Sequence, residues 1–141
     1  MTAIKRLSRL LLFILLAQVV GPVNHVAAQS KGPWVAPKDA DNVKNPLAGN
    51  TDILKYAKVI YSSYCGPCHG NAGKGDGIAA AGLAVKPADH TSDKVQAQSD
   101  GAIFWKLTTG RTPMPSYKAT LPENQRWELV NYIRSLAKNK K

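Results

Sequence analysis

Apolar positions in this chain recur at helical spacing. Near the C-terminus they fall at i, i+3, i+4 and i+7 and predict an amphipathic helix: Leu129, Tyr132, Ile133 and Leu136. An earlier stripe recurs at intervals of four, three and four residues and predicts a second amphipathic helix, with Thr51 as its N-cap: Ile53, Ala57, Ile60 and Tyr64. No segment shows a convincing strand pattern, so the sequence predicts an all-α fold.

Two shorter helical segments are expected between these stripes. Residues 78–85 are mostly Ala, Gly, Leu and Val, which suits a short helical turn that ends at Pro87. Ser99 or Asp100 can cap a further helix, and Gly110 can close it in a left-handed conformation. The pattern therefore predicts about four short helices, with the first and last packed across each other.

The N-terminus has the pattern of a secretory signal peptide. Lys5, Arg6 and Arg9 precede an apolar run over residues 10–20, and small residues before a cleavage site end at about Ala28. The apolar run of eleven residues is well below the ~20 residues that a membrane-spanning helix needs. We therefore expect export to the periplasm, cleavage after about Ala28 and no permanent membrane span.

The remaining chain divides into an arm and one domain. Residues 29–50 are rich in Pro, Gly, Asn and Asp and predict an extended N-terminal arm, whereas residues 51–141 hold the helical pattern. Removal of residues 1–28 takes away three basic and no acidic side chains, so the formal net charge falls from +10 to +7. The basic residues are scattered without interleaved aromatics, which disfavours nucleic acid. These basic residues either form a solvated surface or create an electrostatic field that steers the chain toward an acidic partner.

The chemistry of the chain centres on Cys65-Gly-Pro-Cys68-His69. Two thiols three residues apart, followed by an imidazole, have the spacing for covalent haem attachment. These are the only two cysteines, so none remains for a structural disulfide or a four-cysteine zinc site. A thioredoxin-like thiol-disulfide oxidoreductase that uses the Cys65/Cys68 pair is the competing interpretation. The helix predicted before the motif and the glycine-rich residues 70–77 after it favour haem.

A haem iron held by His69 has few candidates for its second axial ligand. Outside the predicted signal peptide, Met114 is the only methionine and His90 is the only other histidine. Met114 lies between Pro113 and Pro115, which restrict the backbone and lower the entropy lost when a thioether is presented. His90 lies in a polar loop, where a solvated surface position is expected. Met114 is therefore the predicted ligand, and a thioether raises the reduction potential relative to imidazole.

These residues resemble the class I monohaem c-type cytochromes of the bacterial periplasmic type. The resemblance rests on the attachment motif, on Met114-Pro115 and on three further segments, residues 73–77, 100–106 and 126–136. It implies a small cytochrome c fold around one haem c, thioether bonds at Cys65 and Cys68, iron ligation by His69 and Met114, and contact of Tyr132 with the first helix. Trp105 and Arg111 are weaker candidates for contacts to the haem propionates.

Two positions depart from the pattern of the family. Ala57 stands where many relatives have glycine at the helix crossing, and Ile78 stands where relatives often have a proline whose carbonyl accepts the ring proton of the ligating histidine. Any backbone carbonyl can accept that proton, so ligation of iron by His69 is still expected.

The function expected is that of a one-electron carrier that meets redox partner proteins and is not an enzyme. Two alternatives stay open: the thiol-disulfide oxidoreductase described above, and a haem subunit of a larger oxidoreductase complex, in which residues 29–50 would be the docking element.

Overall fold

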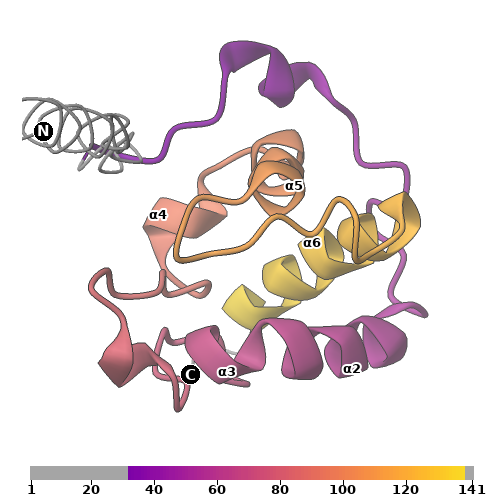
Figure 1. Ribbon diagram of the computed structural model, residues 1–141. Helices are drawn as coiled ribbons and strands as arrows, with labels where there is room; N and C mark the ends of the chain where they lie inside the picture. The colour runs from indigo at the N-terminus through magenta and orange to yellow at the C-terminus, as the bar shows by residue number, and fades with distance from the viewer. Residues whose placement is uncertain (1–31, 139–141) are drawn as a thin grey trace, which may run out of the picture. The chain divides into compact units, whose positions relative to one another are not determined.

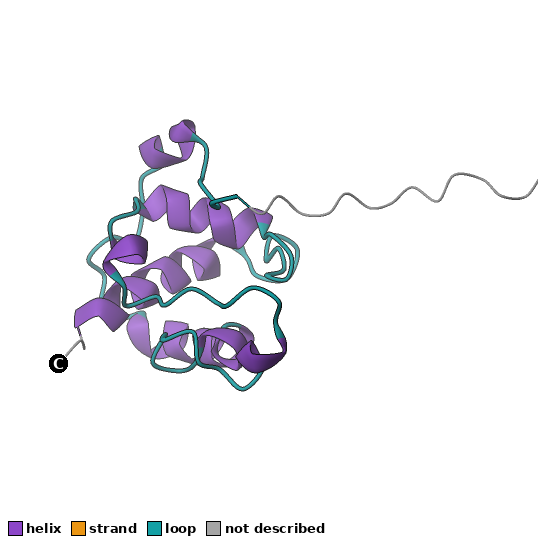
Figure 2. Cartoon of the chain, turned by 90° about the vertical axis from the view of Figure 1, so that its left-hand side faces the viewer, coloured by secondary structure: helices purple, strands orange, loops and turns teal. Residues whose placement is uncertain are grey.

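The computed structural model describes residues 32–138, so the predicted signal peptide lies outside the described residues. It contains five α-helices and two 3-10 helices: η1 (Lys38–Asn42), α2 (Leu54–Tyr64), α3 (Gly66–His69), η2 (Ala80–Gly82), α4 (Asp93–Gln96), α5 (Asp100–Thr109) and α6 (Glu123–Lys138). No strand occurs in this part of the chain, and the predicted all-α fold is confirmed (Figures 1 and 2). The sequence pattern missed α3 and α4 because each has only four residues, too few for an apolar stripe.

The core lies where α6 passes across α2 (Figure 1). Leu129 and Ile133 of α6 are buried against this crossing, and so are Ala57 and Tyr61 of α2. The ring centroids of Tyr61 and Tyr132 lie 4.9 Å apart, which confirms the expected contact of Tyr132 with the first helix. The methyl group of Ala57 is fully buried, so the crossing accommodates a side chain larger than glycine.

Two details predicted for the first helix are wrong. Its N-cap is Ile53, without a side-chain hydrogen bond, so Thr51 does not cap it. Tyr64, assigned to the buried stripe, is 43% exposed, whereas Tyr61 is fully buried. The sequence of α2 contains two overlapping helical stripes, and packing against α6 selects the one through Ala57 and Tyr61.

The start and end of α5 follow the sequence prediction. The Ser99 side-chain oxygen accepts a hydrogen bond from the Ala102 backbone N–H at 3.0 Å, so Ser99 is the N-cap. Gly110 follows the last turn with φ of 65°, a conformation that glycine adopts readily. The helix packs against α6, where the rings of Phe104 and Trp127 stack at 3.9 Å.

The segment before α2 is packed on the helices that follow it (Figure 1). It contains η1, whose Ala40 is buried against the start of α5, and a methyl group on Gly101 would overlap the Ala40 carbonyl. The Asn45 amide donates hydrogen bonds to Asp100 and to Asn131, both at 2.7 Å. Residues 38–50 therefore pack against α5 and α6.

None of the helices within residues 32–138 is long and apolar enough to cross a membrane.

Candidate functional site

A single turn of helix groups the two thiols with an imidazole. Cys65 ends α2 and starts α3, and the His69 backbone N–H donates to the Cys65 carbonyl at 2.8 Å. Residues at i, i+3 and i+4 share one side of a helix, so Cys65, Cys68 and His69 face the same way. Both cysteines are free thiols, with Cys65 buried and Cys68 partly exposed. This geometry can present two thiols and one imidazole to a single flat group.

The ring of His69 is oriented by a backbone carbonyl. Its Nδ1 lies 2.9 Å from the Ala88 carbonyl oxygen, and since that oxygen can only accept, Nδ1 carries the proton. The other nitrogen, Nε2, therefore keeps its lone pair for a metal. Burial lowers the pKa of His69, which favours the neutral, ligating form. Ala88 thus provides the backbone carbonyl that accepts the ring proton of His69.

The glycine-rich loop after α3 folds back onto the same helical turn. The Gly75 N–H donates to the His69 carbonyl at 2.8 Å, and the Gly77 N–H donates to the Cys68 carbonyl at 3.1 Å. Gly73 adopts φ of +77°, and a methyl group there would lie 2.8 Å from Leu136 Cδ1. The absence of side chains therefore lets the loop lie close to both α3 and α6.

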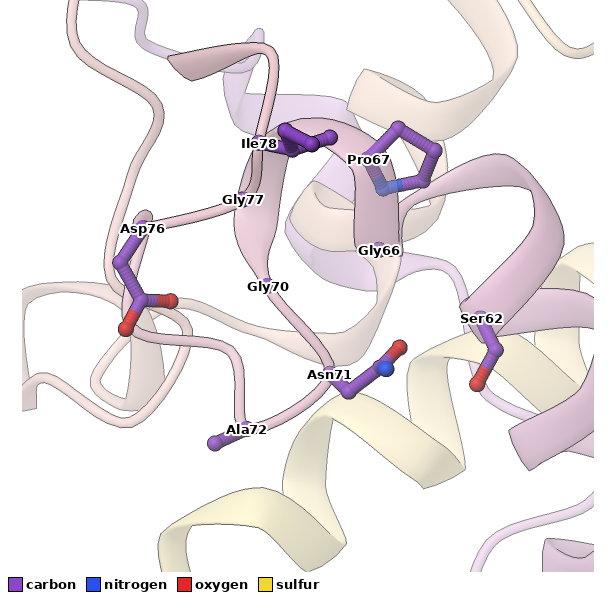
Figure 3. A pocket seen from close by; sticks show the side chains of 9 residues that line it. All are labelled: Ser62, Gly66, Pro67, Gly70, Asn71, Ala72, Asp76, Gly77 and Ile78. Carbon is purple, nitrogen blue, oxygen red and sulfur yellow. The ribbon is translucent and has the colours of Figure 1, made fainter. Parts of the chain in front are cut away.

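An open hollow of about 440 Å³ lies between this loop and α3 (Figure 3). It is lined by Ser62, Gly66, Pro67, Gly70, Asn71, Ala72, Asp76, Gly77 and Ile78. The side chains of Cys65, Cys68 and His69 do not line this hollow.

Cys65 does not have the properties of the reactive thiol in a redox-active Cys-X-X-Cys motif. Burial, together with neighbouring Cys68, raises the pKa of Cys65 to about 12. Thiol-disulfide exchange requires a thiolate. In enzymes of this kind the reactive cysteine follows a strand and lies at the N-terminus of a helix, which lowers the pKa of its thiol. Here α2 precedes the motif, and the first thiol stays protonated at neutral pH. The geometry gives no support to the thioredoxin-like interpretation.

Met114 lies in a tight loop that is held through its backbone. Its N–H and its carbonyl both bond to Arg111 at 2.9 Å, and its half-buried side chain packs against the core. At the end of the loop, the Tyr117 hydroxyl donates to the Tyr64 carbonyl at 2.9 Å. Because Tyr64 directly precedes Cys65, this bond ties the segment that carries Met114 to the attachment helix.

Trp105 and Arg111 both lie beside the ring of Trp34. The ring centroids of Trp34 and Trp105 are 6.5 Å apart, and the Arg111 guanidinium lies 5.2 Å from the Trp34 ring. The Lys106 ammonium lies 5.6 Å from the same ring. The structure therefore groups both propionate candidates around Trp34, and their contact with propionates stays a prediction.

The expectation for His90 is wrong, because this side chain is buried and only 9% exposed. Its ring stacks on that of His69 at a centroid distance of 4.0 Å, and its Nδ1 shares a 2.8 Å hydrogen bond with the Tyr61 hydroxyl. Burial and the adjacent His69 lower the pKa of His90 to about 3, so the ring is neutral. Polar neighbours in the sequence suggested a surface loop and gave no sign of this inward turn.

The donor set fits a covalently bound haem. Two free thiols, an imidazole with its Nε2 available and a thioether in a constrained loop are the groups that attach and ligate haem c. Within residues 32–138, no group of three or more His, Cys, Asp or Glu side chains could hold a metal ion by itself.

Comparison with known proteins supports the same conclusion. The family model described as cytochrome c oxidase, cbb3-type, subunit III matches residues 54–133. Among solved structures, the Kuenenia stuttgartiensis reducing HAO-like protein complex matches with a TM-score of 0.59 and 34% sequence identity. That match covers 67% of this chain and 49% of the other, so the chain spans about half the length of its structural relative. No curated protein matched the chain.

Proposed function

We infer the function of this chain from its site and its family, since it belongs to the c-type cytochromes, in the family described as cytochrome c oxidase, cbb3-type, subunit III. Cytochrome c domains carry covalently bound haem and transfer electrons. We propose that this chain is exported to the periplasm after loss of its signal peptide and carries single electrons on one haem c. The observation that carries the proposal is the single helical turn that groups Cys65, Cys68 and an oriented His69.

Each residue of the site would have a distinct role in holding the haem. Cys65 and Cys68 would hold the haem by thioether bonds, and His69 Nε2 and Met114 Sδ would bind its iron. The bound haem supplies a one-electron iron couple. The Ala88 carbonyl keeps the His69 ring in one tautomer, and the Arg111 backbone holds the Met114 segment in a tight turn. Trp105 and Arg111 would contact the propionates.

The partner is proposed to be a redox protein with an acidic docking face. The predicted mature chain carries a formal net charge of +7, which speeds encounter with an acidic surface. A specific observation favours a second candidate role, as the haem subunit of a larger oxidoreductase: the solved structure that it resembles is a protein complex. Size-exclusion chromatography of a native extract distinguishes the two roles, because a free carrier elutes alone and a subunit elutes with its complex.

The test is the visible spectrum of Met114→Ala beside wild type, with both proteins exported in a host that matures c-type haem. Both should carry covalent haem, and only the oxidised wild type should show the weak far-red band of sulfur bound to ferric iron. If both proteins show that band, then Met114 is not the ligand. If neither carries covalent haem while a control cytochrome matures normally, the proposed function is wrong.

A further inference from the structure

One short segment of the chain contacts the His69 ring at both its edge and its face. The Ala88 carbonyl bonds to Nδ1 at the edge of the ring. Two residues later, the His90 ring stacks on the face of His69, with 4.0 Å between centroids and 19° between planes. Only the Ala88 contact corresponds to the backbone carbonyl that the sequence led us to expect.

His90 is itself held on several sides. Its Nδ1 shares the 2.8 Å bond with the hydroxyl of Tyr61, whose own ring is fully buried in the α2–α6 crossing. Its backbone N–H donates to the Gly73 carbonyl at 2.6 Å, and its carbonyl accepts from the Gln96 side chain at 2.6 Å. The same Gln96 amide donates to the Ile133 carbonyl in α6 at 3.0 Å. The position of the His90 ring is therefore fixed by the core of the domain.

We propose that His90 is a positioning residue that sets the plane of the His69 imidazole when His69 binds iron. This inference rests on the proposed function. A ring bonded through Nε2 keeps one freedom, rotation about the bond from Nε2 to the metal. The hydrogen bond from Nδ1 to the Ala88 carbonyl lies off the axis of that rotation, and the His90 ring covers one face of the imidazole. Both contacts therefore oppose rotation of the His69 ring. The plane of an axial imidazole decides which iron orbitals receive its electron density, and this is visible in the spectrum of the ferric state.

A simple packing role predicts something different. If His90 only filled space, an apolar side chain of similar volume would serve equally well and would change stability alone. An aromatic face is needed only if the stack orients His69. The two roles are separated by comparing an aromatic with an aliphatic replacement in the same background.

The experiment uses two haem-loaded double variants, Tyr61→Phe/His90→Phe and Tyr61→Phe/His90→Leu. Both variants remove the Tyr61 hydroxyl together with the His90 imidazole, so neither leaves one of these two groups buried without its partner. The variants differ in whether residue 90 presents an aromatic face to His69. Electron paramagnetic resonance of the ferric proteins should give wild-type g values for the Phe/Phe protein. The Phe/Leu protein should show shifted and broadened g values, because its His69 ring is held on one side only.

Two controls complete the design. Leu121→Ala opens a cavity in the core at a residue outside the His69 contacts, so it should lower stability and leave the g values unchanged. Wild-type g values in a Phe/Leu protein that carries covalent haem would overturn the role of His90 and leave the proposed function intact. Absence of covalent haem from the wild-type protein would overturn both.

Discussion

The two segments that carry the candidate iron ligands are held in different ways. In the attachment segment, residues 65–90, the His69 ring itself is bonded at its edge and covered on one face. In the methionine loop, residues 110–117, the contacts that shape the turn are made by the backbone of Met114 and by the Tyr117 hydroxyl. The Met114 side chain is half buried and packs against the core through apolar contact.

The difference follows from the chemistry of the two side chains. An imidazole binds metal through one nitrogen in one plane, so its tautomer and its orientation both need a fixed partner. A thioether has no proton to place and three flexible torsions, so a constrained backbone is enough to deliver it. The fold therefore supplies side-chain contacts where orientation matters and backbone constraint where it does not.

The largest expected effect comes from disturbing the attachment segment at Gly77. A methyl group there would overlap the carbonyl of Pro67 and lie 2.5 Å from that of Gly66, both in the backbone of α3. We expect Gly77→Ala to lower the unfolding free energy of the haem-loaded protein by about 3 kcal/mol, the upper part of the usual range for overpacking. Guanidinium-induced unfolding of the haem-loaded variant beside wild type measures this loss of unfolding free energy.

Gly82→Ala is the matched control, because a methyl group at Gly82 has no atom within 4 Å. It should leave stability unchanged or raise it slightly by restricting the unfolded chain. Equal losses of unfolding free energy in Gly77→Ala and Gly82→Ala would show that the close packing of the loop on α3 does not contribute to stability.

The next effect is expected at Tyr61. Tyr61→Phe removes the hydroxyl bonded to His90 Nδ1 and leaves that nitrogen buried without its partner. An unsatisfied buried group costs about 1–3 kcal/mol, so we expect a loss of about 2 kcal/mol in the unfolding free energy. Thermal unfolding of the haem-loaded variant beside wild type measures it, and an unchanged midpoint would show that the bond contributes nothing.

A smaller effect is expected from the same substitution in the methionine loop. Tyr117→Phe removes a hydroxyl bonded to the Tyr64 carbonyl, but Tyr64 is 43% exposed, so water can replace that bond. The expected loss is about 1 kcal/mol or less, as for an ordinary hydrogen bond. A loss larger than that of Tyr61→Phe in the same unfolding experiment would reverse the comparison between the two segments.

Much of the fold could be predicted because its signals are local. The α6 stripe, the Ser99 cap and Gly110 each depend on residues within one or two turns of the chain. The buried face of α2 could not be predicted, because its sequence contains two overlapping apolar stripes and only the packing of α6 decides which one is buried. For the same reason Tyr64 was placed inside and the role of Tyr61 was missed. The predicted domain boundaries and the signal peptide remain predictions.

The sequence by itself determined the chemical groups and their spacing: two thiols and an imidazole in five residues, and one methionine between two prolines. Covalent connectivity fixes such spacing before any folding occurs. Only the tertiary structure decided that Ala88 orients His69, that His90 turns inward onto it and that Trp34 joins Trp105 to Arg111. These contacts join residues 19 or more positions apart in the chain, and long-range packing alone determines which of them meet.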